Sequence, residues 1–319
     1  MKTSLFSTEP NFSLSSKERT YAVATYIPKG KIVTYKILAQ LAFVTNPRLV
    51  GNYLHNNPYP GIIPCHRVVS SQGKVAHTFA FGGEDVQREM LVNEGIEFRN
   101  GKLAVSQYLW YPNQIMQLYW HLLFLYGYPG EWPWFGQDVP HSPEEITLGA
   151  ILTQNTNWKN VTSALRNLRH HNLCSISAVG KLSSSDFEEL ENLIKPSGYY
   201  RQKALYLYGF CKHIVELGDL SALFALEVCK ARKLLLSIKG IGKETADTIL
   251  LYAGKKPVFV IDTYTKRFCK HFNISNNSNY DYLQDLFTKH LPQNYELYQD
   301  YHALIVRWGK AKKFENGVK

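Results

Sequence analysis

The stretch "IPCHRVV", residues 63–69, places a cysteine, a histidine and an arginine side by side between apolar residues. A thiol has a pKa of about 8.5 and reacts as the thiolate, so a nucleophilic cysteine needs a base or a cation near its sulfur. His66 could supply that base to Cys65, although adjacency in sequence does not by itself place the ring at the sulfur. Three interpretations remain open at this point: a buried structural cysteine, a Cys/His hydrolase without the usual flanking "CGSCW", and a thiol that accepts a group from a substrate.

A second stretch, "KGIGKETAD" at residues 239–247, indicates a tight glycine turn between two helices. Gly240 and Gly242 let the backbone bend and leave N–H groups unobstructed at a helix start, which favours binding of a phosphate. Further along, the apolar run "VFVI" leads to Asp262 at the head of another predicted helix. The alternative to a catalytic role for Asp262 is that of a helix N-cap.

Length, composition and charge limit the protein class. With 319 residues, of which 45% are hydrophobic, two domains are expected, over residues 1–108 and 109–319. A net charge of +10 favours a polyanionic partner, nucleic acid first. Five cysteines without a CxxC pair favour neither a disulfide framework nor a metal site. The sequence lacks an apolar run of membrane-spanning length and a signal peptide, so we expect an intracellular protein that does not bind membranes.

The elements around these stretches are mainly helical. Three short helices are expected before Cys65, over residues 18–27, 34–42 and 48–56. Thr34 is the expected N-cap of the second, and the second and third have the spacing of a helix-turn-helix. Asn100-Gly101 between alternating residues predicts a β-hairpin, so the first domain should be winged-helix-like. Residues 109–319 predict an all-α domain cut by Pro and Gly.

The first domain resembles a known family over residues 21–95. The matching text is "IPKGKIVTY", "NPRLVGNYLHNNPYPGIIPCHRVVSSQGKV", "FGG" and "LVNEG". These motifs are similar to the active-site domain of the O6-alkylguanine-DNA alkyltransferases, whose cysteine takes the alkyl group irreversibly. The resemblance implies four catalytic residues: Cys65 as the acceptor, His66 as a base acting through a water, Glu94 as the orienter of His66, and Asn57 as the residue that orders the pocket.

The same resemblance implies how DNA would be held. An alkyl group on guanine O6 cannot be reached inside the stack, so the nucleotide must be rotated out. Arg48 would fill the gap, Gly51 would allow close approach to the groove, and Tyr35 would press on the target phosphate. The alternatives are a surface charge for Arg48, a packing glycine and a core tyrosine. Two departures are the missing N-terminal domain of the family, which bears on stability, and a longer "VAHTFAFGG" segment, which bears on the alkyl groups accepted.

The second domain resembles the helix-hairpin-helix, or endonuclease III, glycosylase superfamily over roughly residues 115–313. The hairpin, Asp262, "LGAILTQNTNWKNV" and "IKPSGYYRQKA" fit this family and point to its 3-methyladenine branch. The resemblance implies that Asp262 stabilises oxocarbenium charge on the sugar. It also implies that Gly240, Gly242 and Lys243 hold the DNA strand, with a monovalent cation able to bind the hairpin carbonyls.

The reaction type follows from one substitution in the hairpin. Lyase members of the superfamily place a Schiff-base lysine where this chain has Glu244. Lys243 lies about 100 degrees round the helix and should not reach the same point. We therefore expect a monofunctional glycosylase. We expect no iron-sulfur cluster and no required cofactor, because "WGKAKKFENGVK" at the C-terminus contains no cysteine.

Aromatic residues suit an alkylated purine. The expected base pocket includes Trp132, Trp134 and Trp158, with Phe135 beside them. A cationic methylated adenine stacked on such rings gains about 1–2 kcal/mol from cation-π contact. Gln154 matches the glutamine that fills the space left by a flipped nucleotide. Core packing is the alternative for the rings, and a local helix contact is the alternative for Gln154.

The sequence thus predicts a monomeric, two-headed protein that acts on double-stranded DNA containing alkylated bases. The first head would transfer an alkyl group to Cys65, and the second would excise bases such as 3-methyladenine. The alternatives for the first head are a lesion sensor and a regulator switched by alkylation of Cys65. The alternative for the second is excision of mismatched or oxidised bases.

Overall fold

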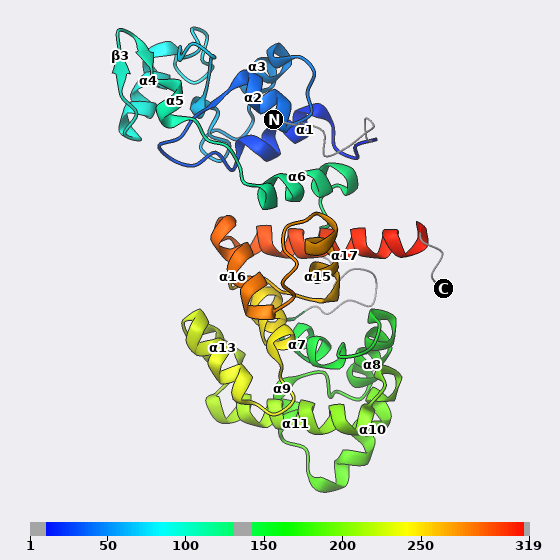
Figure 1. Ribbon diagram of the computed structural model, residues 1–319. Helices are drawn as coiled ribbons and strands as arrows, with labels where there is room; N and C mark the ends of the chain where they lie inside the picture. The colour runs from blue at the N-terminus through cyan, green and yellow to red at the C-terminus, as the bar shows by residue number, and fades with distance from the viewer. Residues whose placement is uncertain (1–10, 131–141, 316–319) are drawn as a thin grey trace. The chain divides into compact units, whose positions relative to one another are not determined.

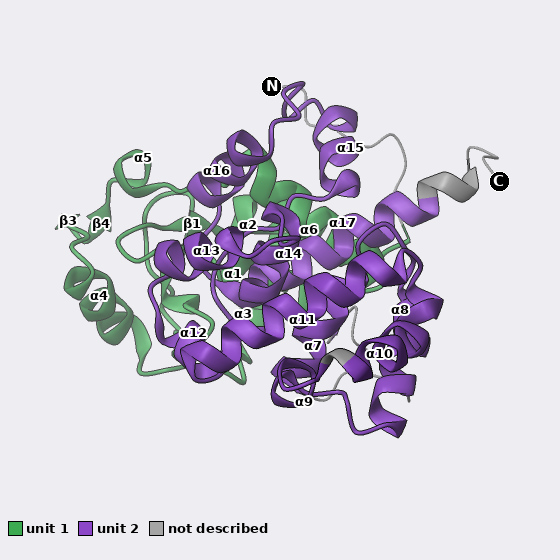
Figure 2. Ribbon diagram, turned by 90° about the horizontal axis from the view of Figure 1, so that it is seen from below, with its two compact units in different colours: residues 1–128 green, residues 129–319 purple. Residues whose placement is uncertain are grey.

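The structure is a computed structural model that describes residues 11–130 and 142–315. The chain divides into two compact units, residues 1–128 and 129–319 (Figure 2). The cysteine stretch lies in the first unit, and the glycine hairpin with Asp262 lies in the second. The two chemical stretches therefore belong to separately folded parts of the chain.

Short helices and two small strand pairs build the first unit (Figure 1). Its elements are α1 (Ser16–Ala24), β1 (Val33–Thr34), α2 (Tyr35–Leu41), α3 (Pro47–His55), the 3-10 turn η1 (Cys65–Arg67), β2 (Val68–Val69), α4 (Gly83–Asn93), β3 (Phe98–Arg99), β4 (Lys102–Leu103), α5 (Val105–Tyr108) and α6 (Gln114–Tyr126). The hydroxyl of Thr34 accepts the N–H of Ile37 at 3.2 Å, so its predicted role as the N-cap of α2 is confirmed. Helices α2 and α3 pack against each other as a helix-turn-helix.

The strand pairs fix the loops around Cys65. Strands β1 and β2 pair in parallel, with Val33 opposite Val68, so the strand after η1 lies beside the strand before α2. Strands β3 and β4 form the predicted hairpin. Its turn residues Asn100 and Gly101 have φ angles of 51° and 74°, the left-handed conformation that Asn-Gly adopts readily.

Helix α6 belongs to the first unit, although the sequence analysis placed residues 109–128 in the second domain. Tyr119 and Trp120 are each 1% exposed, and their rings lie 6.2 and 6.5 Å from that of Tyr26, just after α1. Phe124 contacts the ring of Phe12 edge-on at 5.9 Å. This aromatic packing extends the first compact unit to Tyr128.

The described part of the second unit is helical throughout, as predicted. Its elements are α7 (Pro143–Leu152), α8 (Trp158–His170), α9 (Ile176–Gly180), the 3-10 turn η2 (Ser184–Asp186), α10 (Phe187–Ile194), the 3-10 turn η3 (Lys195–Ser197), α11 (Tyr200–Leu217), α12 (Leu220–Ala225), α13 (Val228–Ser237), α14 (Lys243–Thr248), the π-helical turn η4 (Ile249–Ala253), α15 (Thr263–His271), α16 (Tyr280–His290) and α17 (Tyr295–Glu315). Helices α7 to α14 share one apolar core.

Aromatic side chains form the core of the last three helices, where α15 lies against α17 (Figure 1). Phe259 stacks on Phe287 at 4.3 Å, and Phe268 contacts Trp308 edge-on at 5.3 Å. Because Phe259 is fully buried, this packing anchors the segment that leads to Asp262. Within the described ranges, no helix has the length and apolar character needed to cross a membrane.

Candidate active sites

Cys65 opens the η1 turn directly after Pro64, and only 6% of its surface is exposed. The side-chain amide of Asn57 donates to the Ile63 carbonyl at 3.1 Å and lies 3.5 Å from the Cys65 sulfur. The structure therefore brings Asn57 and Cys65 together, with the amide holding both the loop and the thiol.

His66 and Glu94 also meet. His66 Nε2 lies 2.9 Å from Oε1 of Glu94, the residue that ends α4. Arg67 donates to both carboxylate oxygens at 2.6 to 3.0 Å, and the Gly30 N–H donates to Oε2 at 3.1 Å. Because Nε2 faces Glu94, Nδ1 is the ring nitrogen of His66 that can act as a base.

Charges in this site follow from burial and hydrogen bonding. Burial raises the pKa of the Cys65 thiol more than Asn57 and the backbone N–H groups of Cys65 and His66 lower it. Burial also acts to raise the pKa of Glu94, but hydrogen bonds from Arg67, His66 and Gly30 outweigh it and lower that pKa to about 2. At neutral pH the site therefore combines a protonated thiol with an ionised anchor for His66.

Two residues that hold this site were missed by sequence reasoning. Arg67 binds Glu94, and its place beside His66 in "IPCHRVV" was the available signal. Gln87 is fully buried on α4 and donates to the His66 and Val68 carbonyls at 3.0 and 3.1 Å. It also accepts the Ala76 N–H at 2.7 Å, which joins the η1 turn to the "VAHTFAFGG" segment. The amphipathic pattern of α4 gave no sign that this glutamine is internal.

The three predicted DNA-binding residues of this unit lie on α2 and α3. Arg48 is exposed in the first turn of α3. Gly51 has room for a methyl group, since a Cβ there would meet only the Tyr35 ring, at 3.8 Å. Burial and the charge of Cys65 raise the pKa of Tyr35, so that hydroxyl lies within electrostatic range of the thiol. Packing inside the protein does not require glycine at position 51, which favours close approach by an external partner.

The glycine hairpin of the second unit is braced from two sides. Gly240 has a φ of 89°, and a Cβ there would lie 2.2 Å from the ring of Tyr206. Gly242, in contrast, has no heavy atom within 4 Å of the position of a Cβ. Gln154 donates from its amide to the Gly240 carbonyl at 3.0 Å and to the Thr245 hydroxyl at 3.2 Å. Gln154 therefore contacts the hairpin itself, and Gly242 stays open to a ligand.

Asp262 caps a helix and keeps one oxygen for another partner. Oδ1 accepts the Thr265 N–H at 2.7 Å and the Thr265 hydroxyl at 2.9 Å. Oδ2 lies 3.6 Å from Nε2 of His302 on α17. Burial acts to raise the pKa of Asp262, but His302 and Thr265 outweigh it and lower that pKa. The capping and catalytic interpretations are thus compatible, because capping uses only one carboxylate oxygen.

The two hairpin residues after Gly242 have different surroundings. The Lys243 ammonium donates to the carboxylate of Asp281 on α16. Desolvation and the charge of Asp262 raise the pKa of Glu244, so the Glu244 carboxyl lies within electrostatic range of Asp262. The hairpin residue that interacts electrostatically with Asp262 is therefore the acid Glu244, whereas Lys243 forms an ion pair with Asp281.

Aromatic residues of the expected base pocket are only partly accounted for. Trp132, Trp134 and Phe135 lie outside the described residues. Trp158 is the first residue of α8, is partly exposed, and packs against the core of the second unit. Tyr199, directly before α11, is 74% exposed and has a φ of 48°. A bulky residue in that conformation is unusual, and its signal in the sequence is the "PSGYY" turn.

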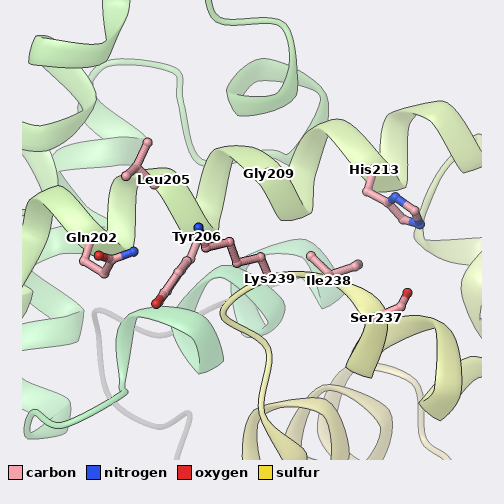
Figure 3. A pocket seen from close by; sticks show the side chains of 8 residues that line it. All are labelled: Gln202, Leu205, Tyr206, Gly209, His213, Ser237, Ile238 and Lys239. Carbon is pink, nitrogen blue, oxygen red and sulfur yellow. The ribbon is translucent and has the colours of Figure 1, made fainter.

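An open pocket of about 430 Å³ lies between α11 and the segment that leaves α13 (Figure 3). Residues of both segments line it: Gln202, Leu205, Tyr206, Gly209, His213, Ser237, Ile238 and Lys239. Tyr206 extends from α11 into this region (Figure 3), and its ring packs against Gly240, where an added Cβ would lie 2.2 Å from it. Lys239, directly before the glycine turn, brings a positive charge to the rim of this pocket.

Each unit has relatives of its own. Residues 15–96 match the 6-O-methylguanine DNA methyltransferase DNA-binding domain, and residues 148–293 match the HhH-GPD superfamily of base excision DNA repair proteins. The chain is 41% identical over 204 residues to a "Putative DNA repair glycosylase" of Methanocaldococcus jannaschii, covering 63% of this chain and 88% of the relative. It is 40% identical over 96 residues to a "DNA base-flipping protein" of Vibrio parahaemolyticus, covering 29% and 92%. The crystal structure of H. pylori 3-methyladenine DNA glycosylase bound to 1,N6-ethenoadenine is 30% identical with a TM-score of 0.52, covering 62% and 94%.

Proposed function

Because the chain belongs to the HhH-GPD superfamily of base excision DNA repair proteins and carries a 6-O-methylguanine DNA methyltransferase DNA-binding domain, we propose that it repairs alkylated DNA by two reactions. The first unit takes the alkyl group from O6-alkylguanine, and the second excises alkylated bases such as 3-methyladenine. The protein acts inside the cell as a monomer on double-stranded DNA. It needs no metal or cluster for either reaction.

Alkyl transfer is supported by one arrangement, the buried Cys65 thiol next to a histidine that Glu94 and Arg67 anchor. As the Cys65 sulfur bonds to the alkyl carbon, the bond from that carbon to guanine O6 breaks. The thiol proton passes to His66, and the bonding electrons stay on guanine, which takes up a proton. The thioether persists, so each protein molecule reacts once.

Access to guanine O6 depends on α3. The target nucleotide must leave the stack, which favours an exposed cation that can occupy the gap and a helix face without bulk. Arg48 and Gly51 supply these features on α3, and the Tyr35 hydroxyl lies within electrostatic range of the thiol. We assign Arg48 as the wedge, Gly51 as the point of closest approach and Tyr35 as the phosphate contact.

A second candidate for the first unit is lesion recognition without transfer. The likeness to a relative named a DNA base-flipping protein favours it. A third candidate function for the first unit is that of a regulator switched by alkylation of Cys65. A sensor needs no nucleophile, whereas this chain keeps Cys65 with its amide donor and an anchored histidine, so transfer is the better supported function.

Base excision by the second unit centres on Asp262. The bond from sugar C1′ to the base nitrogen breaks with both electrons leaving on the base, and the ionised Asp262 stabilises the sugar cation. Water then adds to C1′ and gives its proton to the carboxylate and on to solvent. Gly242 and Lys239 contact the strand, and Trp158 with Trp132 and Trp134 stacks on the base. The likeness to 3-methyladenine DNA glycosylase favours alkylated bases over mismatched or oxidised ones.

One experiment tests both reactions. The full chain is incubated with duplexes that contain O6-methylguanine or 3-methyladenine, followed by intact-mass analysis and chromatography of released bases. We expect one added methyl group on Cys65 and release of 3-methyladenine. Cys65→Ser should abolish only the first and Asp262→Asn only the second. Methyl transfer that survives in Cys65→Ser would exclude the acceptor, and release of only mismatched or oxidised bases would exclude the alkylation branch.

The wedge assignment has its own control. Arg48→Ala should slow methyl transfer from duplex DNA far more than transfer from free O6-benzylguanine, because only the duplex requires base flipping. Equal slowing with both substrates would make Arg48 a structural residue.

A further inference from the structure

A chain of polar groups lies behind Asp262 and has no part in the mechanism above. His302 is 8% exposed, and its Nε2 lies 3.6 Å from Asp262 Oδ2. Its other ring nitrogen, Nδ1, lies 2.7 Å from the hydroxyl of Tyr252, which is 6% exposed. The same hydroxyl lies 3.5 Å from the Gln299 carbonyl. The imidazole therefore bridges the carboxylate and a buried tyrosine.

This row of polar groups links the glycine hairpin to Asp262. Tyr252 belongs to the π-helical turn η4, which continues α14 without a break. π-helical turns are rare and occur often at functional sites. Gln299 donates from its amide to the Leu251 carbonyl at 2.8 Å, which fixes α17 to that turn. His302 is thus held by the element that follows the hairpin as well as by its own helix.

The donors and acceptors around His302 are satisfied in two forms of the ring. In the neutral form with its hydrogen on Nε2, the Tyr252 hydroxyl donates to Nδ1, whereas an imidazolium donates from Nδ1 to that hydroxyl. In both forms the hydrogen on Nε2 faces Asp262 Oδ2, which lies 3.6 Å from that nitrogen. His302 thereby lowers the pKa of Asp262 without touching the substrate.

Other charged groups surround this pair and belong to three elements. Asp262 interacts electrostatically with Glu244 on α14, and Lys266 on α15 acts on Glu244 in turn. Asp300 on α17 acts on Tyr252, as Asp262 does. Burial and the Thr265 hydrogen bonds also act on Asp262, and the pKa of Asp262 is lowered overall. Of these groups, His302 has its ring placed directly against the oxygen that Thr265 leaves available.

We propose that His302, supported by Tyr252, is a positioning residue that holds Asp262 Oδ2 ionised and aimed for base excision. This inference rests on the proposed glycosylase function. His302 neither gives nor takes a proton in the reaction. It sets the charge and orientation of the carboxylate that stabilises the sugar cation.

The test uses the full chain with His302→Gln, which keeps an amide near Asp262 but removes the imidazole. One readout is the titration of the Asp262 carboxyl by 13C NMR of aspartate-labelled protein, assigned with Asp262→Asn. The other is the pH profile of single-turnover release of 3-methyladenine. We expect both the titration and the acid limb to move to higher pH, and the neutral rate to fall about tenfold, which corresponds to about 1.4 kcal/mol of lost stabilisation of the sugar cation.

Tyr252→Phe is the second variant, and it should shift both readouts in the same direction by less, with a rate loss of about twofold. His290→Gln on α16 is the matched control and should leave both readouts unchanged. An unchanged Asp262 titration in folded His302→Gln and Tyr252→Phe would overturn the inference, whatever the protein excises. A shifted titration without release of any base would uphold it and overturn only the proposed excision.

Discussion

At Glu94 a single carboxylate receives hydrogen bonds from Arg67, His66 and Gly30. Its pKa falls from 4.5 to about 2 in the folded protein. Because the folded value is below the unfolded one, the stabilisation is complete above pH 4.5 and is lost as pH falls toward about 2. Glu94→Gln should therefore flatten the loss of stability of the first unit in this range, measured by hydrogen exchange between pH 6 and pH 3.

The control for this prediction is Glu97→Gln, because the Glu97 side chain is 70% exposed. It should keep the acid sensitivity of the parent protein. If Glu94→Gln and the parent lose protection in parallel below pH 4.5, the Arg67 and His66 contacts do not stabilise the folded state.

A second prediction at this scale concerns strand cleavage. Lys243 is paired with Asp281, and the neighbour that senses the charge of Asp262 is Glu244. A carboxylate cannot form the imine that β-elimination requires, so the protein should leave an uncut abasic site. Borohydride should trap no covalent complex with DNA. A trapped complex that disappears in Lys243→Ala would instead make the second unit a lyase.

At the scale of the helices, one substitution in α3 is expected to change the stability of the fold and the affinity for DNA in opposite directions. A methyl group fits at Gly51, so Gly51→Ala should keep the fold and stabilise α3 by about 0.5–1 kcal/mol through helix propensity. The same methyl group would stand between the helix and the DNA groove, so affinity for duplex should fall. Denaturant unfolding and DNA titration measure the two effects. Unchanged affinity would leave Gly51 without a role in DNA binding.

The hairpin gives a matched pair of glycines. Gly240→Ala should destabilise the second unit, because its φ is 89° and a Cβ would overlap the Tyr206 ring. Gly242→Ala should leave the unfolding midpoint nearly unchanged but weaken DNA binding, since its surroundings within the protein are open. Thermal melting and DNA affinity separate the two. Similar losses of stability in both variants would mean that Gly242 also serves packing.

Local signals explain which elements could be predicted. The Thr34 cap, the Asn100-Gly101 hairpin and the helix-turn-helix each depend on a few consecutive residues, and the structure confirms them. The family motifs also predicted which residues gather around Cys65. His302 and Gln87 escaped prediction because their partners lie in other elements, well separated from them in the sequence, and a polar residue in a helical segment gives no sign of such contacts. The π-helical turn at Tyr252 likewise has no local sequence signature.

At the scale of the whole molecule, two compact units share one basic chain of net charge +10. Each unit contains its own core and its own candidate site. The pairing is chemically coherent, because methylating agents damage both guanine O6 and adenine N3. For the two proposed reactions, this charge would supply a common attraction to DNA phosphates, so both should weaken as salt rises.

The last prediction concerns which fragments of the chain fold independently, and it depends on the unit to which α6 belongs. Tyr119, Trp120 and Phe124 are buried in the first unit, and burial of such side chains is worth about 1.5–3 kcal/mol each. A fragment of residues 129–319 should therefore remain soluble and release 3-methyladenine, while one of residues 109–319 should aggregate through the uncovered α6. In the same way, residues 1–128 should accept a methyl group and residues 1–108 should not fold stably. Size-exclusion chromatography and the two activity assays decide this, and a soluble, active 109–319 fragment beside a stable 1–108 fragment would return α6 to the second domain.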